Sequence, residues 1–181
     1  MKTDIVIDGQ FGSTWKGKLS AQLAKEKNYA AAVRVQSIQA GHTIYHEGQK
    51  FVMRTLPCAW VDPDVDLIIG PGAFVEKELL ESEMRMIREA GYSVDHRTFI
   101  DYRTTFVTQQ DMDEEAAQKL TERRGSTGEG SGTSLCRKLM RSEGVVQARD
   151  EVEWLESIGI KVIDTIHYYR NSLDSEARVL V

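Results

Sequence analysis

A glycine- and lysine-rich segment near the N-terminus, Gly12–Lys18, matches the G-x-x-x-x-G-K pattern of phosphate-binding loops. Glycine lets backbone N–H groups turn toward phosphate oxygens, and the start of the following helix adds positive partial charge. Lys16 and Lys18 supply two full positive charges. A P-loop continues with the Ser or Thr that holds Mg²⁺, whereas this chain has Leu19. The segment therefore predicts phosphate binding and disfavours an ordinary P-loop kinase. The alternative is a glycine turn that leads into a basic helix.

Two further clusters combine flexible backbone with polar groups. Gln39–Thr43 reads Q-A-G-H-T and offers one histidine. Ser126–Gly130 reads S-T-G-E-G and offers two hydroxyls, which suit a second phosphate. Taken singly, the first cluster is more typical of a loop histidine and the second of a solvated loop.

The elements that must position these loops alternate between strands and helices. Short apolar runs predict strands, periodic apolar residues predict helices, and Gly48 predicts the turn of a β-hairpin. The predicted strands are 4–8, 30–35, 65–69, 97–100, 160–163 and 177–181, and the hairpin arms are 42–47 and 49–56. The predicted helices are 18–27, 74–90, 111–123, a segment that contains Arg137, Lys138 and Arg141, and 150–158. This order predicts an α/β, P-loop-like fold: a mainly parallel sheet flanked by helices, with a small β-hairpin.

Length and composition limit the class of protein. The 181 residues and 20.4 kDa suit one nucleotide-binding α/β domain over residues 1–181. A net charge of −5 and a pI of about 5.4 argue against a nucleic-acid partner. No apolar run approaches the roughly 20 residues of a membrane-spanning helix, and the N-terminus lacks a signal-peptide pattern. Cys58 and Cys136 lie outside any CxxC pattern, which suits a reducing compartment. We therefore expect a cytoplasmic protein with no membrane partner.

In their order along the chain, these clusters resemble the motifs of adenylosuccinate synthetases. That family has G-x-Q-[W/F]-G-D-E-G-K-G-K, N-A-G-H-T, I-I-G-N-G and G-T-T-G-R-G-I-G, and the similar segments here are 9–18, 39–43, 68–72 and 125–132. The resemblance spans nearly the whole chain and stops where a family member continues into an E-G-x-Q-G motif. It implies the N-terminal portion of a longer synthetase.

The resemblance implies a C–N ligase of purine nucleotide biosynthesis that needs Mg²⁺ and works in two steps. ATP donates its γ-phosphoryl group to the 6-oxygen of a purine monophosphate, and the amine of L-aspartate then displaces that phosphate. The implied catalytic residues are Ser13, Lys16 and His42. The implied ATP- and phosphate-binding residues are Gly12, Ser13, Thr14, Gly17, Lys18, Gly41, His42 and Thr43. Those implied for the purine monophosphate are Ser13, Gln39, Ser126, Thr127 and Arg141, and those for the metal are Ser13 and the Gly41 carbonyl. Because the arginine at the place of Arg141 reaches a neighbouring subunit in that family, a homodimer is also implied.

Ser13 departs from the family, which has an Asp that accepts the N1 proton of IMP and binds Mg²⁺. A serine hydroxyl is a poor base, and losing a general base typically costs about 10²–10⁴ in rate. The chain is similar in this replacement to the phage-type branch, 2-aminoadenylosuccinate synthetase, which uses dGMP and ATP. That similarity implies N6-succino-2-amino-2′-deoxyadenylate as the product.

Two alternatives to this interpretation stay open. One is an ordinary IMP-specific synthetase that has drifted at Ser13, and the other is a non-catalytic nucleotide-binding protein. The residues alone also leave open whether ATP or GTP is the donor, and whether the substrate is a ribo- or a deoxyribonucleotide. A further departure is Trp15, which stands where the family has glycine and for which the sequence indicates no contact.

Overall fold

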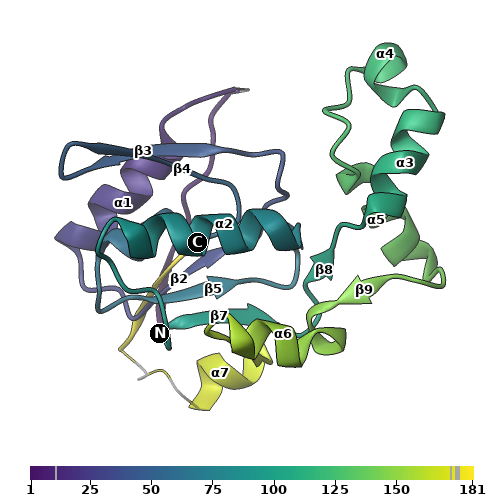
Figure 1. The fold of residues 1–181 in the computed structure, drawn as a ribbon. Coiled ribbons are helices and arrows are strands. Elements are labelled where there is room, and N and C mark those ends of the chain that lie inside the picture. The colour runs from purple at the N-terminus through teal and green to yellow at the C-terminus, as the bar shows by residue number, and fades with distance from the viewer. Residues whose placement is uncertain (11, 172, 174–175) are drawn as a thin grey trace.

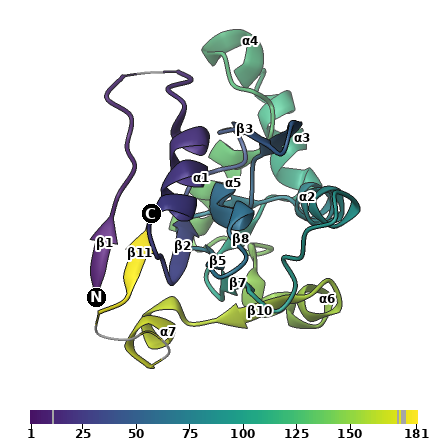
Figure 2. The same cartoon turned by 90° about the vertical axis from the view of Figure 1, so that its left-hand side faces the viewer.

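In the part of the chain that the structure describes, the core is a six-stranded parallel sheet. The computed structural model describes residues 1–10, 12–171, 173 and 176–181. Neighbouring strands follow the order β1 (Lys2–Asp4), β11 (Arg178–Leu180), β2 (Ala31–Arg34), β5 (Asp66–Ile69), β7 (Thr98–Asp101) and β10 (Ile160–Ile163). Figure 2 shows these strands side by side, and every pairing among them is parallel. The predicted α/β fold with a mainly parallel sheet is confirmed.

The two faces of the sheet are covered by different elements. Ala32 and Leu67 point to the face that carries the largest hydrophobic cluster. The elements that cover this face are α1 (Lys16–Glu26), the antiparallel hairpin of β3 (His42–His46) and β4 (Gln49–Met53), the 3₁₀ helix η1 (Cys58–Val61) and α2 (Lys77–Glu89) (Figure 1). Ala31 and Ile68 point to the opposite face, where they pack with Tyr168 of α7 (Thr165–Asn171). The hairpin is thus confirmed as a separate small sheet above the parallel one.

A second group of elements projects from the carboxyl-end side of the sheet (Figure 1). Its small sheet has the strand order β6 (Phe74–Val75), β8 (Thr105–Phe106) and β9 (Val146–Gln147). Its helices are α3 (Gln109–Ala117), α4 (Leu120–Arg124) and α5 (Ser131–Met140), and the 3₁₀ helix η2 (Ala148–Asp150) leads on to α6 (Val152–Ser157) beside β10. Ser37 forms an isolated β-bridge with Phe74, so the chain after β2 is tied to this group.

Several predicted boundaries are wrong, each for a local reason. The regular part of the first strand ends at Asp4, and Ile5 and Ile7 are 65% and 79% exposed. The predicted helix over 74–90 begins at Lys77, because the two residues Phe74–Val75 pair with β8 instead. The predicted helix over 111–123 is divided at Lys119, whose backbone is left-handed. No helix in the described residues is both long and apolar enough to cross a membrane.

A buried carboxylate on α2 holds the chain that leaves the hairpin. Glu83 is 2% exposed. Its oxygens accept hydrogen bonds from the backbone N–H groups of Arg54 at 2.5 Å, Thr55 at 3.0 Å and Leu56 at 2.8 Å. One side chain therefore satisfies three successive backbone donors that the end of β4 leaves unpaired.

Replacing Glu83 by Ala should lower the free energy of unfolding strongly. Each of the three donors left without an acceptor costs about 1–3 kcal/mol, so we expect a loss of at least about 3 kcal/mol. Glu83→Gln keeps one oxygen acceptor and should lose roughly half as much. Urea unfolding measures both, with Glu89→Ala on the exposed side of α2 as a control that changes stability by less than about 0.5 kcal/mol. A Glu83→Ala loss no larger than that control would contradict this account.

Candidate functional site

The phosphate loop lies between β1 and α1, at the carboxyl end of the parallel sheet. This edge is where open parallel sheets bind their ligands. Helix α1 begins at Lys16 and has no side-chain cap, so its first backbone N–H groups are not used by a capping residue. Gly17 is required here, because a Cβ atom on it would stand 2.6 Å from Cβ of His42. The absence of a side chain at Gly17 therefore lets the loop pack directly against the histidine.

The first two predicted clusters meet in one cavity of about 560 Å³. The phosphate loop forms one part of its wall and the segment before and into β3 forms the other. The predicted residues that line it are Gly12, Ser13, Thr14, Lys16, Gly17, Lys18, Gln39, Gly41, His42 and Thr43, and Trp15, Ala40 and Tyr45 line it as well. The fold therefore brings the histidine and both lysines to the same cavity.

His42 is held in one tautomer by a buried arginine. Nη1 of Arg34 lies 3.1 Å from Nδ1 of His42. Because a guanidinium only donates, Nδ1 must accept, which leaves the ring proton on Nε2. Burial, together with the charges of Arg34 and Lys16, lowers the pKa of His42 from 6.5 to about 4. His42 is therefore neutral at pH 7, and its buried Nε2 has no partner among the described residues, so it can donate a hydrogen bond to a ligand.

Arg34 is a buried cation that sequence reasoning missed. It is 5% exposed, and its Nη2 donates to the carbonyl of Ala40. Its Nε and the Oε1 of Gln36 are buried without a hydrogen-bond partner in the described chain. A charged residue at the end of the apolar strand 30–35 was the available signal, because buried charges normally have a partner.

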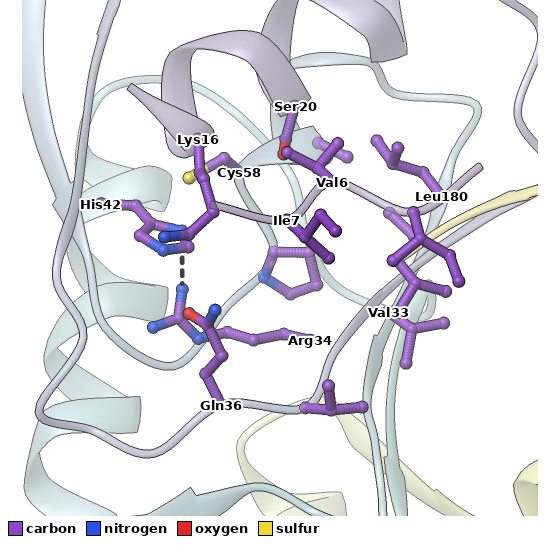
Figure 3. A pocket seen from close by; sticks show the side chains of 16 residues that line it. Val6, Ile7, Lys16, Ser20, Val33, Arg34, Gln36, His42, Cys58 and Leu180 are labelled. Carbon is purple, nitrogen blue, oxygen red and sulfur yellow. Dashed lines mark hydrogen bonds between the residues drawn. The ribbon is translucent and has the colours of Figure 1, made fainter. Parts of the chain in front are cut away.

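A second cavity, of about 180 Å³, lies next to the first. Figure 3 shows that Lys16, Arg34 and His42 gather at one end of it. The other end is apolar, with Val6 and Leu180 among the residues that line it. Lys16 and His42 line both cavities, so the two cavities adjoin at these residues.

The two lysines of the phosphate loop have different partners. Lys16 forms an ion pair with Asp8. Asp8 is a second site residue that sequence reasoning missed. Its position directly after the apolar run 5–7 was the available signal. The ammonium of Lys18 lies 4.5 Å from the centre of the Trp15 ring. Lys18 is exposed and has no ion pair within the described ranges, so its charge is open to an anion.

The loop of the third cluster is joined to the segment before the second cluster by a pair of serines and by Arg54. Oγ of Ser37 donates to Oγ of Ser131 at 2.8 Å. Arg54 forms an ion pair with Glu129, and its Nε donates to the Ile38 carbonyl at 2.7 Å. These contacts fix the loop before α5 against the segment that leads to Gln39.

The predicted residues of the third cluster do not line either cavity. Ser126 donates to Glu115 at 2.9 Å, and Thr127 donates to Glu129 at 3.3 Å. The Glu115 carboxylate also accepts from the backbone N–H of Gly132 at 3.1 Å, so it occupies the N-terminus of α5. Arg141 lies beyond the other end of α5, where it is exposed with a left-handed backbone. The structure therefore does not bring these residues to the phosphate loop.

The predicted magnesium ligands are neutral oxygens, the hydroxyl of Ser13 and the carbonyl of Gly41. The described residues contain no group of three or more His, Cys, Asp or Glu that could hold a metal ion. Mg²⁺ is usually held by one or two protein oxygens together with substrate phosphates and water. Both residues line the 560 Å³ cavity. This donor set fits an ion that arrives on the phosphates of a nucleotide.

The comparisons with known proteins agree with one another. The sequence model of the family described as adenylosuccinate synthetase matches residues 5–153. The adenylosuccinate synthetase of Methanococcus maripaludis is 28% identical over 183 residues, which cover 100% of this chain and 52% of that protein. The corresponding protein of Thermococcus onnurineus is also 28% identical, with the same shares covered. This chain therefore spans about half the length of these curated relatives.

Two solved structures share the fold. The cyanophage S-2L succinoaminodeoxyadenylate synthetase (PurZ), bound to dGMP and to dATP as an energy donor, has a TM-score of 0.82 and 26% identity. It covers 99% of this chain, which in turn covers 50% of it. The fully ligated adenylosuccinate synthetase of Plasmodium falciparum has a TM-score of 0.77 at 18% identity, with 99% of this chain and 50% of that one covered.

The imidazole of His42 should titrate far below neutral pH. NMR of the labelled ring should give a midpoint near 4, because burial is the main cause of the lowered pKa. Lys16→Met should raise that midpoint only slightly, since the charge of Lys16 is the smallest of the three causes. The unfolded chain takes up the proton near 6.5, so stability due to the neutral ring should be lost as the pH falls from 6.5 toward about 4. A midpoint near 6.5 in the folded protein would contradict the described burial.

Proposed function

The chain belongs to the adenylosuccinate synthetase family, and on that premise we propose that it forms the nucleotide-binding part of a C–N ligase of purine biosynthesis. The proposed reaction joins L-aspartate to the 6-position of a purine monophosphate at the expense of ATP. The observation that carries the proposal is the cavity in which the phosphate loop, with Lys16 and Lys18, meets His42. Two cations and a neutral N–H donor around one space suit a group that gains negative charge during transfer.

In the first proposed step, the 6-oxygen of the purine forms a bond to the γ-phosphorus of ATP, and the bond from that phosphorus to the β-phosphate oxygen breaks. The purine loses its N1 proton to solvent water, because the hydroxyl of Ser13 is a poor base. The Nε2–H of His42 would donate to the transferring phosphoryl group, and Lys16 would offset its charge. Arg34 acts through His42, because it keeps the proton on Nε2. In the second step, the amine nitrogen of aspartate forms a bond to C6 and loses a proton to solvent. The bond from C6 to the 6-oxygen breaks, and that oxygen leaves as part of inorganic phosphate.

Members of this family need Mg²⁺. The hydroxyl of Ser13 and the carbonyl of Gly41 would hold the ion together with the nucleotide phosphates. When bound, it supplies positive charge that neutralises those phosphates.

We further propose dGMP as the preferred monophosphate and N6-succino-2-amino-2′-deoxyadenylate as the product. Two observations support this choice: Ser13 in place of a carboxylate, and the similarity to a cyanophage synthetase bound to dGMP. A small neutral hydroxyl leaves room for the 2-amino group of guanine. The 2-amino group could donate a hydrogen bond there, where inosine has only C–H. The IMP-specific synthetase and the non-catalytic nucleotide-binding protein are the two competing possibilities.

The substrate assignment predicts that dGMP supports turnover better than IMP. The purified protein is mixed with ATP, Mg²⁺ and aspartate, with either monophosphate, and the absorbance of the succinylated purine is followed. Faster turnover with IMP would favour the ordinary synthetase. Binding of nucleotides without turnover would favour the non-catalytic alternative.

Ser13→Asp provides the matched variant for this assignment. A carboxylate beside the base must be desolvated, so the variant should weaken dGMP binding in a calorimetric titration by about tenfold or more. Ser13→Ala removes the hydroxyl without adding charge and should weaken it less. An equal effect of both variants would argue against a role of charge at this position.

We also propose a homodimer in which Arg141 contacts the monophosphate of the neighbouring subunit. Its exposure and its distance along α5 from Ser126 and Thr127 support this arrangement. Ser126 and Thr127 would complete that phosphate site. Their hydroxyls would then have to give up their hydrogen bonds to Glu115 and Glu129 and donate to the phosphate instead.

Arg141→Ala should weaken dGMP binding while ATP affinity stays within about twofold, a difference below about 0.5 kcal/mol. Calorimetric titration with each nucleotide measures the two effects, and sedimentation of the wild-type protein measures assembly. A strictly monomeric protein, or an unchanged dGMP affinity in the variant, would remove Arg141 from the site.

A further inference from the structure

Trp15 is an exposed aromatic residue within the phosphate loop. The residue lines the 560 Å³ cavity, and it is 71% exposed. Tryptophan has one of the largest apolar surfaces to bury, so an open ring on a cavity wall is a costly placement without a ligand. Among the described residues, the contact with the ammonium of Lys18 leaves most of this side chain open.

The backbone at Trp15 is also unusual. With φ 67° and ψ 19°, the residue is left-handed at the position just before α1. Glycine adopts this conformation freely, whereas a bulky side chain is strained there. Such strain is found mainly at ligand-binding and active sites. A function of the ring would explain why a tryptophan occupies a position that suits glycine.

A second exposed aromatic faces the same cavity from another element. Tyr45 on β3 is 71% exposed and lines the cavity with Trp15. Tyr45 lies two residues after Thr43, and alternate residues of a strand share one face. Both residues therefore line the cavity. Two aromatic rings, one from the loop and one from the hairpin, thus border one space.

The ring of Trp15 lies directly beside the phosphate-binding groups. The ammonium of Lys18 is 4.5 Å from the ring centre, so the cation lies against the aromatic ring. A volume of about 560 Å³ falls within the roughly 300–1,000 Å³ of pockets for small organic ligands. The cavity can therefore hold more than a phosphate chain.

We propose that Trp15 and Tyr45 bind the purine base of the nucleoside triphosphate by stacking, while the loop backbone, Lys16 and Lys18 bind its phosphates. The inference rests on the proposed function, since it assigns the base contacts of the same donor nucleotide. Stacking on an aromatic ring is tolerant of the base, because every base has a π face. The two rings would therefore add affinity without choosing adenine over guanine.

The test compares ATP with inorganic tripolyphosphate, which has the phosphates and lacks the base. Trp15→Ala should weaken ATP binding about tenfold and leave tripolyphosphate binding unchanged in calorimetric titrations. Tyr45→Ala should act in the same direction, and Trp15→Phe and Tyr45→Phe should each keep most of the affinity. Because both side chains are largely exposed, these variants should fold.

Intrinsic fluorescence gives a second measurement. ATP should quench Trp15 and tripolyphosphate should not, and the quenching should vanish in Trp15→Phe, which retains the buried Trp60 and the partly buried Trp154. Equal affinity of the wild-type protein for ATP and tripolyphosphate would overturn the stacking proposal and leave the phosphate loop in place. Equal loss of both ligands in Trp15→Ala would also overturn it. A wild-type protein that binds neither ligand would overturn the proposed function itself.

Discussion

The arrangement of the site depends on one buried guanidinium. Arg34 stands at the end of β2, inside the protein, and has no carboxylate partner among the described residues. Its two terminal nitrogens contact the carbonyl of Ala40 and the ring of His42 instead. The loop between β2 and β3 is thereby folded back over the arginine, and the histidine is presented to Gly17 at the start of α1. Buried charges without a counter-charge are rare in proteins, so the site retains a positive field that an anionic ligand can satisfy.

The local charge of the site contrasts with that of the whole chain. The protein carries a net charge of −5, yet Lys16, Lys18 and Arg34 lie around the two adjacent cavities. Focusing of positive charge in a partly closed space raises the local concentration of anions even when the overall charge is negative. The net charge of the whole chain therefore gave no indication of a site for small phosphorylated ligands.

Much of the fold could be predicted because the signals are local. The apolar spacing of Leu80, Met84 and Ile87 predicts α2, and Gly48 predicts the hairpin turn. The first two clusters lie together because both follow parallel strands whose carboxyl ends share one edge of the sheet. No local sequence pattern predicts the place of β11 in the strand order of the sheet. This strand comes from the far end of the chain and inserts between β1 and β2, which leaves β1 at the edge with only three paired residues.

The remaining differences come from contacts between distant parts of the sequence. Glu115 belongs to α3, yet it accepts the hydroxyl of Ser126 and the first backbone N–H groups of α5. Nothing in the S-T-G-E-G pattern indicates that its hydroxyls already have acceptors. The role of Arg34 was hidden in the same way, because its partners Ala40 and His42 become visible only when the chain turns back. Tertiary hydrogen bonds, rather than propensities, decide which of the predicted groups are open to a ligand.

The ion pair between Asp8 and Lys16 means that an anionic ligand of Lys16 competes with a carboxylate of the protein. Asp8 serves as a built-in counterion, so a ligand that binds Lys16 must displace a carboxylate rather than neutralise a free cation. A monoanion such as chloride gains little from that exchange, because it replaces one negative charge by another. A polyphosphate gains more, since it also reaches Lys18 and the uncapped N–H groups of α1. The ion pair therefore favours ligands that carry several negative charges, independently of any contact with a base.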